Sequence, residues 1–298
     1  MNIVKIKIAD VVIALKSVFP VKPIGLDSGW RYGQFLYHGK KPAQIRLTVK
    51  VVDSFPAFTL GPRLFFARHP ASREINWRLF RCGEGYLIKQ GVSRKNIAVL
   101  LNRNFCRGVV YFINPKNKEW FVSGIIYDFL QVLLINFLSL RQGLFMHSVG
   151  LRDTNGCGYL FAGESGAGKS TTARIWYKYS RARILNDDRV IVRMIREKFY
   201  IYGTPWHGDF HDFLSSETGM AELKKVFFIR HARKHICHRL ESKDAFPALF
   251  PNTFPVFWGP PCLKAQMELC KSLARRVSFY RLGFKPERSL IPFIRTRR

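Results

Sequence analysis

Apolar and polar residues alternate along much of the first third of the chain, and this alternation predicts short strands. The apolar run from Ile3 is broken by lysines at alternate positions, and apolar residues fill every second position from Ile45 to Val51. A period of two places such side chains on one face of a strand. Turn residues such as Gly61-Pro62 separate the runs. We therefore expect residues 1–118 to form a mostly β module, although no motif assigns it a role.

The pattern changes at residues 122–140, which are almost entirely apolar over a length that could cross a bilayer. Asp128, Gln131 and Asn136 interrupt this segment, and apolar residues recur along it every three or four positions, which is helical spacing. A carboxylate near the middle of a lone membrane span is costly. The pattern thus favours a core helix with a narrow polar edge over a membrane span.

The second half of the chain predicts a different arrangement of elements. Apolar strands are expected at residues 144–151 and 159–162, followed by a glycine-rich turn, a helix from Lys169 to about Tyr179, and further strands up to Tyr202. Strand, glycine loop, helix and strand is the order of a phosphate-binding α/β unit. The predicted fold class is therefore α/β, with a P-loop nucleotide-binding domain over residues 119–298 preceded by the β module. The boundary rests on this change of pattern alone.

Composition adds a strong positive charge. The 298 residues are 47% hydrophobic, enough for one large or two modest domains, and 49 Lys and Arg against 20 Asp and Glu give a net charge of +29. A protein with this charge attracts polyanions.

Six cysteines without a CxxC pair argue against a disulfide scaffold or a zinc ribbon. Together with an N-terminus that lacks a secretory core, they predict a cytoplasmic protein.

The residues after the second predicted strand satisfy the Walker A pattern G-x-x-x-x-G-K-[ST] in full. Such a loop turns its backbone N–H groups inward, its lysine reaches the outer phosphates and its serine can bind magnesium. The following helix start also favours a phosphate. The alternative is a glycine turn that happens to contain a lysine. We expect ATP and Mg²⁺ to bind here, at Gly163, Glu164, Ser165, Gly166, Ala167, Gly168, Lys169, Ser170 and Thr171.

Two adjacent carboxylates, Asp187 and Asp188, follow Lys169 after a further predicted strand. A nucleotide site that performs chemistry needs acidic groups to hold magnesium and to orient the acceptor. One carboxylate can bind the metal, directly or through water, while the other accepts a proton from an attacking hydroxyl. Which residue takes which role stays open. The alternative is a simple turn between strands, since Asn186 and aspartates are common turn residues.

The form G-x-S-G-x-G-K-[ST] resembles the loop of HPr kinase/phosphorylase and of the phosphoenolpyruvate-carboxykinase-like nucleotide-binding fold. Residues 146–148 resemble the histidine-bearing strand of that family, residues 186–188 its acidic pair, and residues 202–206 a segment of its kinase-like relatives. The resemblance covers residues 120–298. The asparagine- and glycine-containing signature that follows the acidic pair in true HPr kinases is absent, so neither HPr as the substrate nor the phosphorylase direction is implied.

The resemblance implies a magnesium-dependent phosphotransferase with a hydroxyl acceptor. Lys169 and Ser170 would hold the triphosphate and the metal, Asp187 and Asp188 would share metal binding and acceptor activation, and His147 would lie near the phosphates in a catalytic role. An isolated histidine at a strand end is the alternative for His147. The acceptor is expected to be an acidic protein, an acidic peptide or a small molecule.

Other features carry weaker predictions. His207 and Asp209 could face a substrate, and the run 231–238 offers metal-ligand residue types without a standard zinc spacing, which favours a solvated basic strand end. Three arginines end the chain, Arg295, Arg297 and Arg298, and could bind anions. A nucleic-acid-associated ATPase ranks second because no reading motif and no single basic stripe is present. A nucleotide sensor without catalysis ranks third, and a second copy of the chain stays open as a partner.

Overall fold

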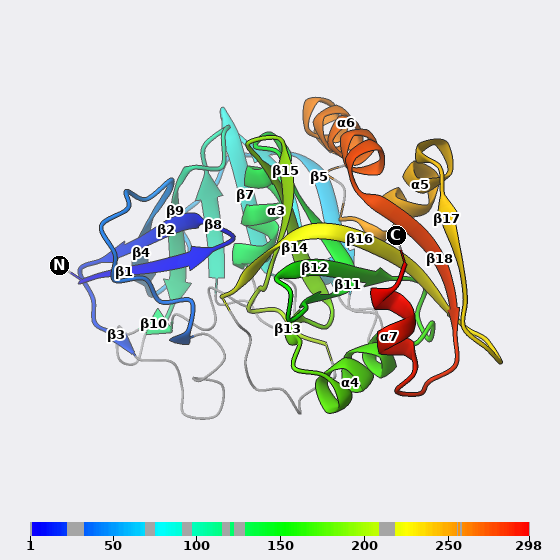
Figure 1. Cartoon of the computed structure of the whole chain (residues 1–298). Coiled ribbons are helices and arrows are strands. Elements are labelled where there is room, and N and C mark those ends of the chain that lie inside the picture. Colours follow the sequence, from blue (N-terminus) through cyan, green and yellow to red (C-terminus); the bar gives the residue numbers. More distant parts are fainter. Residues whose placement is uncertain are drawn as a thin grey trace. The chain divides into compact units, whose positions relative to one another are not determined.

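The computed structural model describes residues 2–22, 33–68, 75–90, 97–114, 120–121, 129–208, 218–254, 256 and 258–297. The chain divides into two compact units, Met1–Phe137 and Leu138–Arg298, and Figure 1 shows their strands and helices. The boundary expected near residue 118 falls outside the described residues.

A mixed eight-stranded sheet forms most of the first unit. Its order is β1-β2-β4-β9-β8-β7-β6-β5, with β4 parallel to both of its neighbours and the other pairs antiparallel. A short parallel pair, β3 with β10, lies outside it. The bounds are β1 Asn2–Ile8, β2 Val11–Ser17, β3 Val21–Lys22, β4 Ile45–Val52, β5 Leu60–Arg68, β6 Ile75–Cys82, β7 Gly85–Gln90, β8 Ile97–Leu101, β9 Arg107–Ile113 and β10 Trp120–Phe121.

The two faces of β4 differ in burial. In β4, Ile45, Leu47 and Val49 are buried, whereas Arg46 and Lys50 between them are exposed. The strand predicted from this alternation is confirmed. In β4 the period of two therefore determines which side chains enter the core and which meet water.

The second unit contains another mixed sheet of eight strands, of order β12-β11-β14-β15-β16-β18-β17, with β13 also paired to β11. β16 pairs in parallel with both β12 and β18. The elements are β11 Gly143–Arg152, β12 Cys157–Ala162, α4 Lys169–Tyr179, β13 Arg183–Asn186, β14 Arg189–Ile195, β15 Lys198–Tyr202, β16 Met220–His231, β17 Ile236–Leu240, α5 Ser242–Leu249, η2 Phe250–Asn252, α6 Pro260–Arg276, β18 Ser278–Phe284 and α7 Leu290–Arg295.

The pairings of this second sheet close a circuit through β12, β11, β14, β15, β16 and back to β12. Two apolar clusters pack against its strands. One cluster includes Leu269 and Leu273 of α6, and the other includes Trp176 of α4 and Ile294 of α7. The glycine loop between β12 and α4 is thus attached to a strand and a helix that are both anchored in the core.

The predicted fold class is wrong. The chain is mostly β, with two large mixed sheets of eight strands, and is not an α/β P-loop domain preceded by a β module. The local order of strand, loop and helix from β12 to α4 is present. That order does not determine how remote strands pair, and the antiparallel partners of β12 and β14 make the sheet mixed.

The apolar segment 122–140 contains α3, Gln131–Ser139. Leu133, Leu134 and Leu138 are buried, and the amide of the buried Asn136 donates to the backbone oxygen of Val132 at 2.8 Å. Residues 122–128, including Asp128, lie outside the described part of the chain. Within that part, no helix is both long enough and apolar enough to span a bilayer.

Candidate functional site

The glycine loop runs from the end of β12 to the start of α4 and requires glycine at several points. Gly166 and Gly168 have φ values of +80° and +99°, in the left-handed region that glycine adopts most easily. A Cβ on Gly168 would lie 2.7 Å from the Phe284 ring, and one on Gly163 would lie 2.9 Å from the Ile229 carbonyl oxygen. The loop therefore follows a close path over the ends of β16 and β18.

Lys169 is the first residue of α4. Its Nζ donates hydrogen bonds to the carbonyl oxygens of Gly163 at 2.8 Å and Glu164 at 3.0 Å, so the ammonium group lies across its own loop. Burial lowers the pKa of Lys169, and the charge of Asp188 opposes that shift. The loop carbonyls hold the ammonium where a bound phosphate can accept its hydrogen bonds instead.

Asp188 lies in the turn between β13 and β14. Its Oδ1 is 3.0 Å from His147 Nε2, and its Oδ2 is 3.2 Å from an Arg189 guanidinium nitrogen. His147 on β11 and Arg189 on β14 are cross-strand partners, which explains why both reach the same carboxylate. Burial raises the pKa of Asp188, but the His147 hydrogen bond and the charges of Arg189 and Lys169 outweigh it and lower the pKa overall. Asp188 is consequently held ionised.

Asp187 is 4% exposed and is held from a different side. The backbone N–H of Gly208 donates to Asp187 Oδ1 at 2.9 Å, and His207 Nδ1 lies 3.7 Å from the same oxygen. A Cβ on Gly208 would lie 2.8 Å from Asp187 Oδ2, so this approach needs glycine. The segment after β15 thereby fixes Asp187.

The buried Asn186 positions the acidic pair. Its Oδ1 accepts hydrogen bonds from the backbone N–H groups of Asp188 at 2.8 Å and Arg189 at 2.7 Å. Its Nδ2 donates to the carbonyl oxygens of Thr204 at 3.0 Å and Trp206 at 2.9 Å. Because the amide satisfies groups on both sides, it joins the turn of the carboxylates to the segment that ends at Gly208.

These groups open onto one cavity of about 360 Å³. The cavity brings together most of the residues predicted to form the site. Gly163, Glu164 and Ala167 belong to the glycine loop but do not line the cavity. His207 contacts Asp187 from outside the lining, and Asp209 lies outside the described residues. The lining consists of His147, Ser165, Gly166, Gly168, Lys169, Ser170, Thr171, Asp187, Asp188, Gly208 and His231.

Of the lining residues, Gly208 was not singled out by the sequence analysis, and His231 was considered only as one of the metal-ligand residue types in the run 231–238. His231, at the end of β16, is exposed as expected for a basic strand end, but it also lines the cavity. A Cβ on Gly168 would lie 3.0 Å from the His231 ring. No local signal in 231–238 distinguishes His231 from His235, which instead contacts Ser289 Oγ at 2.9 Å. Only the pairing of β16 with β12 brings His231 to the loop.

The oxygen-bearing side chains that line this cavity are suitable ligands for a magnesium ion. Ser170, Asp187 and Asp188 line the same cavity and offer hydroxyl and carboxylate oxygens, the hard donors that Mg²⁺ prefers. Magnesium in nucleotide sites takes one or two carboxylates and completes its shell with phosphate and water. Among the residues that the structure describes, no group of three or more His, Cys, Asp and Glu side chains could hold a metal by itself.

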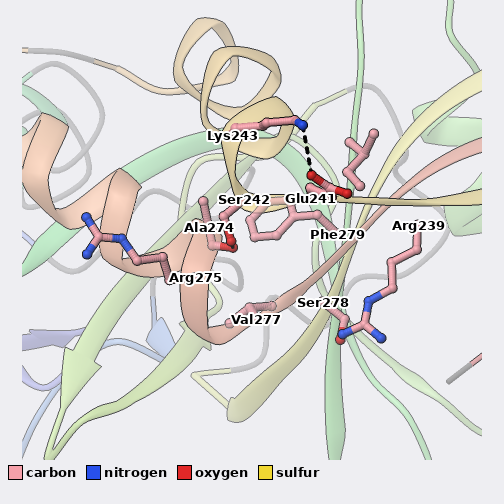
Figure 2. Close-up of a pocket in the computed structure, with 10 residues that line it drawn as sticks. Arg239, Glu241, Ser242, Lys243, Ala274, Arg275, Val277, Ser278 and Phe279 are labelled. Atoms are coloured by element: carbon pink, nitrogen blue, oxygen red, sulfur yellow. Dashed lines mark hydrogen bonds and ion pairs between the residues drawn. The ribbon is translucent and has the colours of Figure 1, made fainter.

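A larger cavity of about 580 Å³ lies between β17, β18 and the ends of α5 and α6. It contains Arg239, Lys243 and Arg275, but Lys243 is paired with Glu241 at 3.0 Å. Figure 2 shows the Arg239 and Arg275 side chains pointing apart rather than towards a common point. Size alone does not make this cavity a site, and the smaller one contains the convergent chemistry.

No family model matches the chain, and the curated proteins searched include no significant match. The functional argument therefore rests on the geometry of the 360 Å³ cavity.

Proposed function

We propose that the protein is an ATP- and Mg²⁺-dependent phosphotransferase that transfers the γ-phosphoryl group to a hydroxyl of a protein, peptide or small molecule. The observation that carries the proposal is the shared cavity, which Lys169 and Ser170 line together with Asp187, Asp188 and His147. The resemblance of these segments to those of HPr kinase supports the same reaction. Phosphoryl transfer demands positioning and charge stabilisation more than covalent chemistry from the protein.

In this proposal the loop binds the phosphates. The backbone N–H groups of the loop and of the first turn of α4 face an anion, and the helix dipole favours it. Lys169 exchanges the carbonyl oxygens of Gly163 and Glu164 for phosphate oxygens. Ser170 and Asp188 are the residues that would hold Mg²⁺, which when bound neutralises charge on the outer phosphates.

The two carboxylates take different roles in the proposal. Asp188 contacts His147 through one oxygen and Arg189 through the other and has a lowered pKa, so it stays ionised and orients His147. Asp187, held by the backbone of Gly208, is the assigned proton acceptor. The acceptor hydroxyl loses its proton to Asp187 and forms a bond to the γ-phosphorus, while the bond from that phosphorus to the bridging oxygen breaks and ADP leaves.

The test follows γ-labelled ATP with Mg²⁺ into protein, peptide and small-molecule fractions of a cell extract. Wild type should label an acceptor, and Lys169→Ala and Asp187→Asn should lower the transfer rate by about 100-fold or more, since a positioned base contributes about 10²–10⁴-fold. Asp244→Asn is the matched control because Asp244 lies in the first turn of α5, outside the cavity. Transfer that survives Lys169→Ala would refute the proposal. Binding of ATP without turnover would indicate a nucleotide sensor.

A further inference from the structure

One face of the first sheet carries a row of cationic and aromatic side chains that the register of the strands places side by side. Cross-strand pairing joins each member to the next over six adjacent strands. At about 4.8 Å between strands, the row is about 24 Å long. From β4 to β5 it consists of Lys50, Tyr111, Ala98, Lys89, Arg78 and Phe66. We call it the basic–aromatic row.

The row lies on the less buried of the two faces of this sheet. The neighbouring register row, one residue away along each strand, consists of Val49, Val110, Val99, Ile88 and Leu79, and each is at most 2% exposed. In the basic–aromatic row, Lys50 is exposed, Tyr111, Lys89, Arg78 and Phe66 are half-buried, and Ala98 is fully buried. A second exposed cationic pair, Arg46 and Arg107, lies on the same face.

Aromatic rings accompany the cations along this row. Lys50 Nζ lies 6.0 Å from the centre of the Tyr111 ring, and Lys89 Nζ lies 5.9 Å from the rings of both Phe55 and Phe58. The Phe58 ring meets Tyr111 edge to face at 5.6 Å. Phe55 and Phe58 precede β5 and fold over the middle of the row. Half-buried rings therefore lie beside the ammonium groups of Lys50 and Lys89.

We propose that the basic–aromatic row binds single-stranded nucleic acid. Sites for unpaired strands combine cationic side chains that follow the phosphates with aromatic rings on which bases stack. Here Lys50, Lys89 and Arg78 supply the charge, and Tyr111 and Phe66 lie between and beside them. The outward positions of the described strands β4, β6, β7, β8 and β9 include no acidic residue. Folding thus collects into one stripe the cations that are dispersed along the sequence.

The aromatic residues decide between a nucleic acid and an acidic protein. A polyanionic protein needs only the cations, whereas bases gain stacking energy from Tyr111 and Phe66. A duplex hides its base faces, so the rings favour an unpaired strand. The proposal is independent of phosphotransfer, because it concerns residues of the first unit and is tested without nucleotide.

The test measures fluorescence anisotropy of a labelled thymidine oligonucleotide of about 20 nucleotides with the full chain over a range of salt concentrations. Lys50→Gln/Lys89→Gln should weaken binding and reduce the slope of log affinity against log salt by about 1.4, since each phosphate contact on a single strand contributes about 0.7. Lys243→Gln/Arg275→Gln removes two charges from the second unit and should have little effect. Equal losses in the two double variants would overturn the proposal, because net charge alone would then explain binding.

Stacking is tested separately at Tyr111. Tyr111→Leu should weaken binding by about 5- to 150-fold with an unchanged salt slope, the effect of losing one stacked base, and Tyr111→Phe should retain the wild-type affinity. Because the two variants differ in the ring, loss with Leu and retention with Phe identifies stacking, provided that urea unfolding shows Tyr111→Leu to be folded under the binding conditions. Polyglutamate and vesicles with anionic lipid serve as competitors. If either displaces the oligonucleotide as well as unlabelled oligonucleotide does, and Tyr111→Leu binds normally, the surface recognises charge and the proposal fails.

Discussion

A single carboxylate, that of Asp188, shows how this site keeps a partly buried group charged. Burial favours its neutral form, and the contacts of His147 and Arg189 more than compensate. A group whose pKa is lowered on folding contributes stability above its unfolded pKa, and that contribution is lost as the pH falls through the folded pKa. The same two contacts therefore determine how far into acid the proposed site keeps its charge.

We predict that Arg189→Gln raises the pKa of Asp188, because the guanidinium at 3.2 Å from Oδ2 is removed. The acid limb of the pH profile of phosphotransfer should move to higher pH, with a smaller change at neutral pH, where Asp188 is ionised in both proteins. The measurement is the transfer rate from neutral pH down to below pH 3.8, the ordinary carboxyl pKa from which that of Asp188 is lowered. Arg196→Gln, in the exposed turn between β14 and β15, is the control and should leave the limb in place. An unshifted limb in Arg189→Gln would exclude Asp188 as the group that controls it.

At the scale of an element, the glycine loop depends on a steric contact that its sequence pattern does not reveal. Gly168 has a positive φ and also lies against the Phe284 and His231 rings. Gly156, in the β11–β12 turn, has a similar φ of +82° but no atom within 4 Å of an added Cβ. The two glycines separate the cost of backbone conformation from the cost of close packing.

We predict that Gly156→Ala destabilises the protein by about 1–2 kcal/mol, the cost of a left-handed non-glycine residue. Gly168→Ala should cost at least about 1 kcal/mol more, because the methyl group must displace Phe284 or His231. It should also abolish ATP binding, whereas Gly156→Ala should retain it. Urea unfolding and ATP titration measure the two effects. Equal destabilisation of the two variants would show that the Phe284 and His231 rings move aside without loss of stability.

The elements also show which parts of the site a sequence can predict. The loop, the start of α4 at Lys169 and the adjacent carboxylates are local, so residue types at short spacing indicate them. Gly208 and His231 reach the cavity only through the pairing of β15 with β14 and of β16 with β12. Their own neighbours in sequence carry no sign of that pairing. Asn186 entered the sequence analysis as part of the segment that resembles the acidic pair, with a simple turn as the alternative, and its amide is hydrogen-bonded on both sides of the site.

At the scale of the whole molecule, the same distinction explains the wrong fold class. The pattern from β12 to α4 matches a phosphate-binding α/β unit, but antiparallel partners such as β11 and β15 determine the class of the sheet. In the first unit, periodicity correctly predicts the strand from Ile45. It does not predict strand order, and the basic–aromatic row exists only through that order. Charge that is dispersed along the chain thus becomes a surface only after folding.

The end of the described chain is tied into the second unit by an ion pair with one buried partner. Arg295 in α7 donates to Asp153 Oδ2 at 2.9 Å and Oδ1 at 2.6 Å, and the Asp153 side chain is 1% exposed. Burial raises the pKa of Asp153, but the Arg295 hydrogen bonds and the Thr154 N–H outweigh it and lower the pKa overall. The Arg295 guanidinium also lies 5.5 Å from the Trp176 ring of α4. This pair connects α7 to the turn before β12, the strand that carries the glycine loop.

We predict that Arg295→Leu destabilises the protein by about 2–4 kcal/mol at neutral pH, because it leaves the Asp153 carboxylate buried without its cation. This loss of stability is slightly below the usual range for a buried pair, since the Arg295 side chain is 39% exposed.

The loss of stability in Arg295→Leu should shrink as the pH falls through the folded pKa of Asp153, where the carboxylate becomes neutral. Asp153→Asn/Arg295→Leu should recover part of the loss for the same reason. Arg276→Leu is the control, because its partner Glu197 is 70% exposed and the pair should contribute less than about 1 kcal/mol. Urea unfolding at several pH values measures all three, and a penalty for Arg295→Leu that is independent of pH would assign the loss to packing against Trp176 instead of to charge.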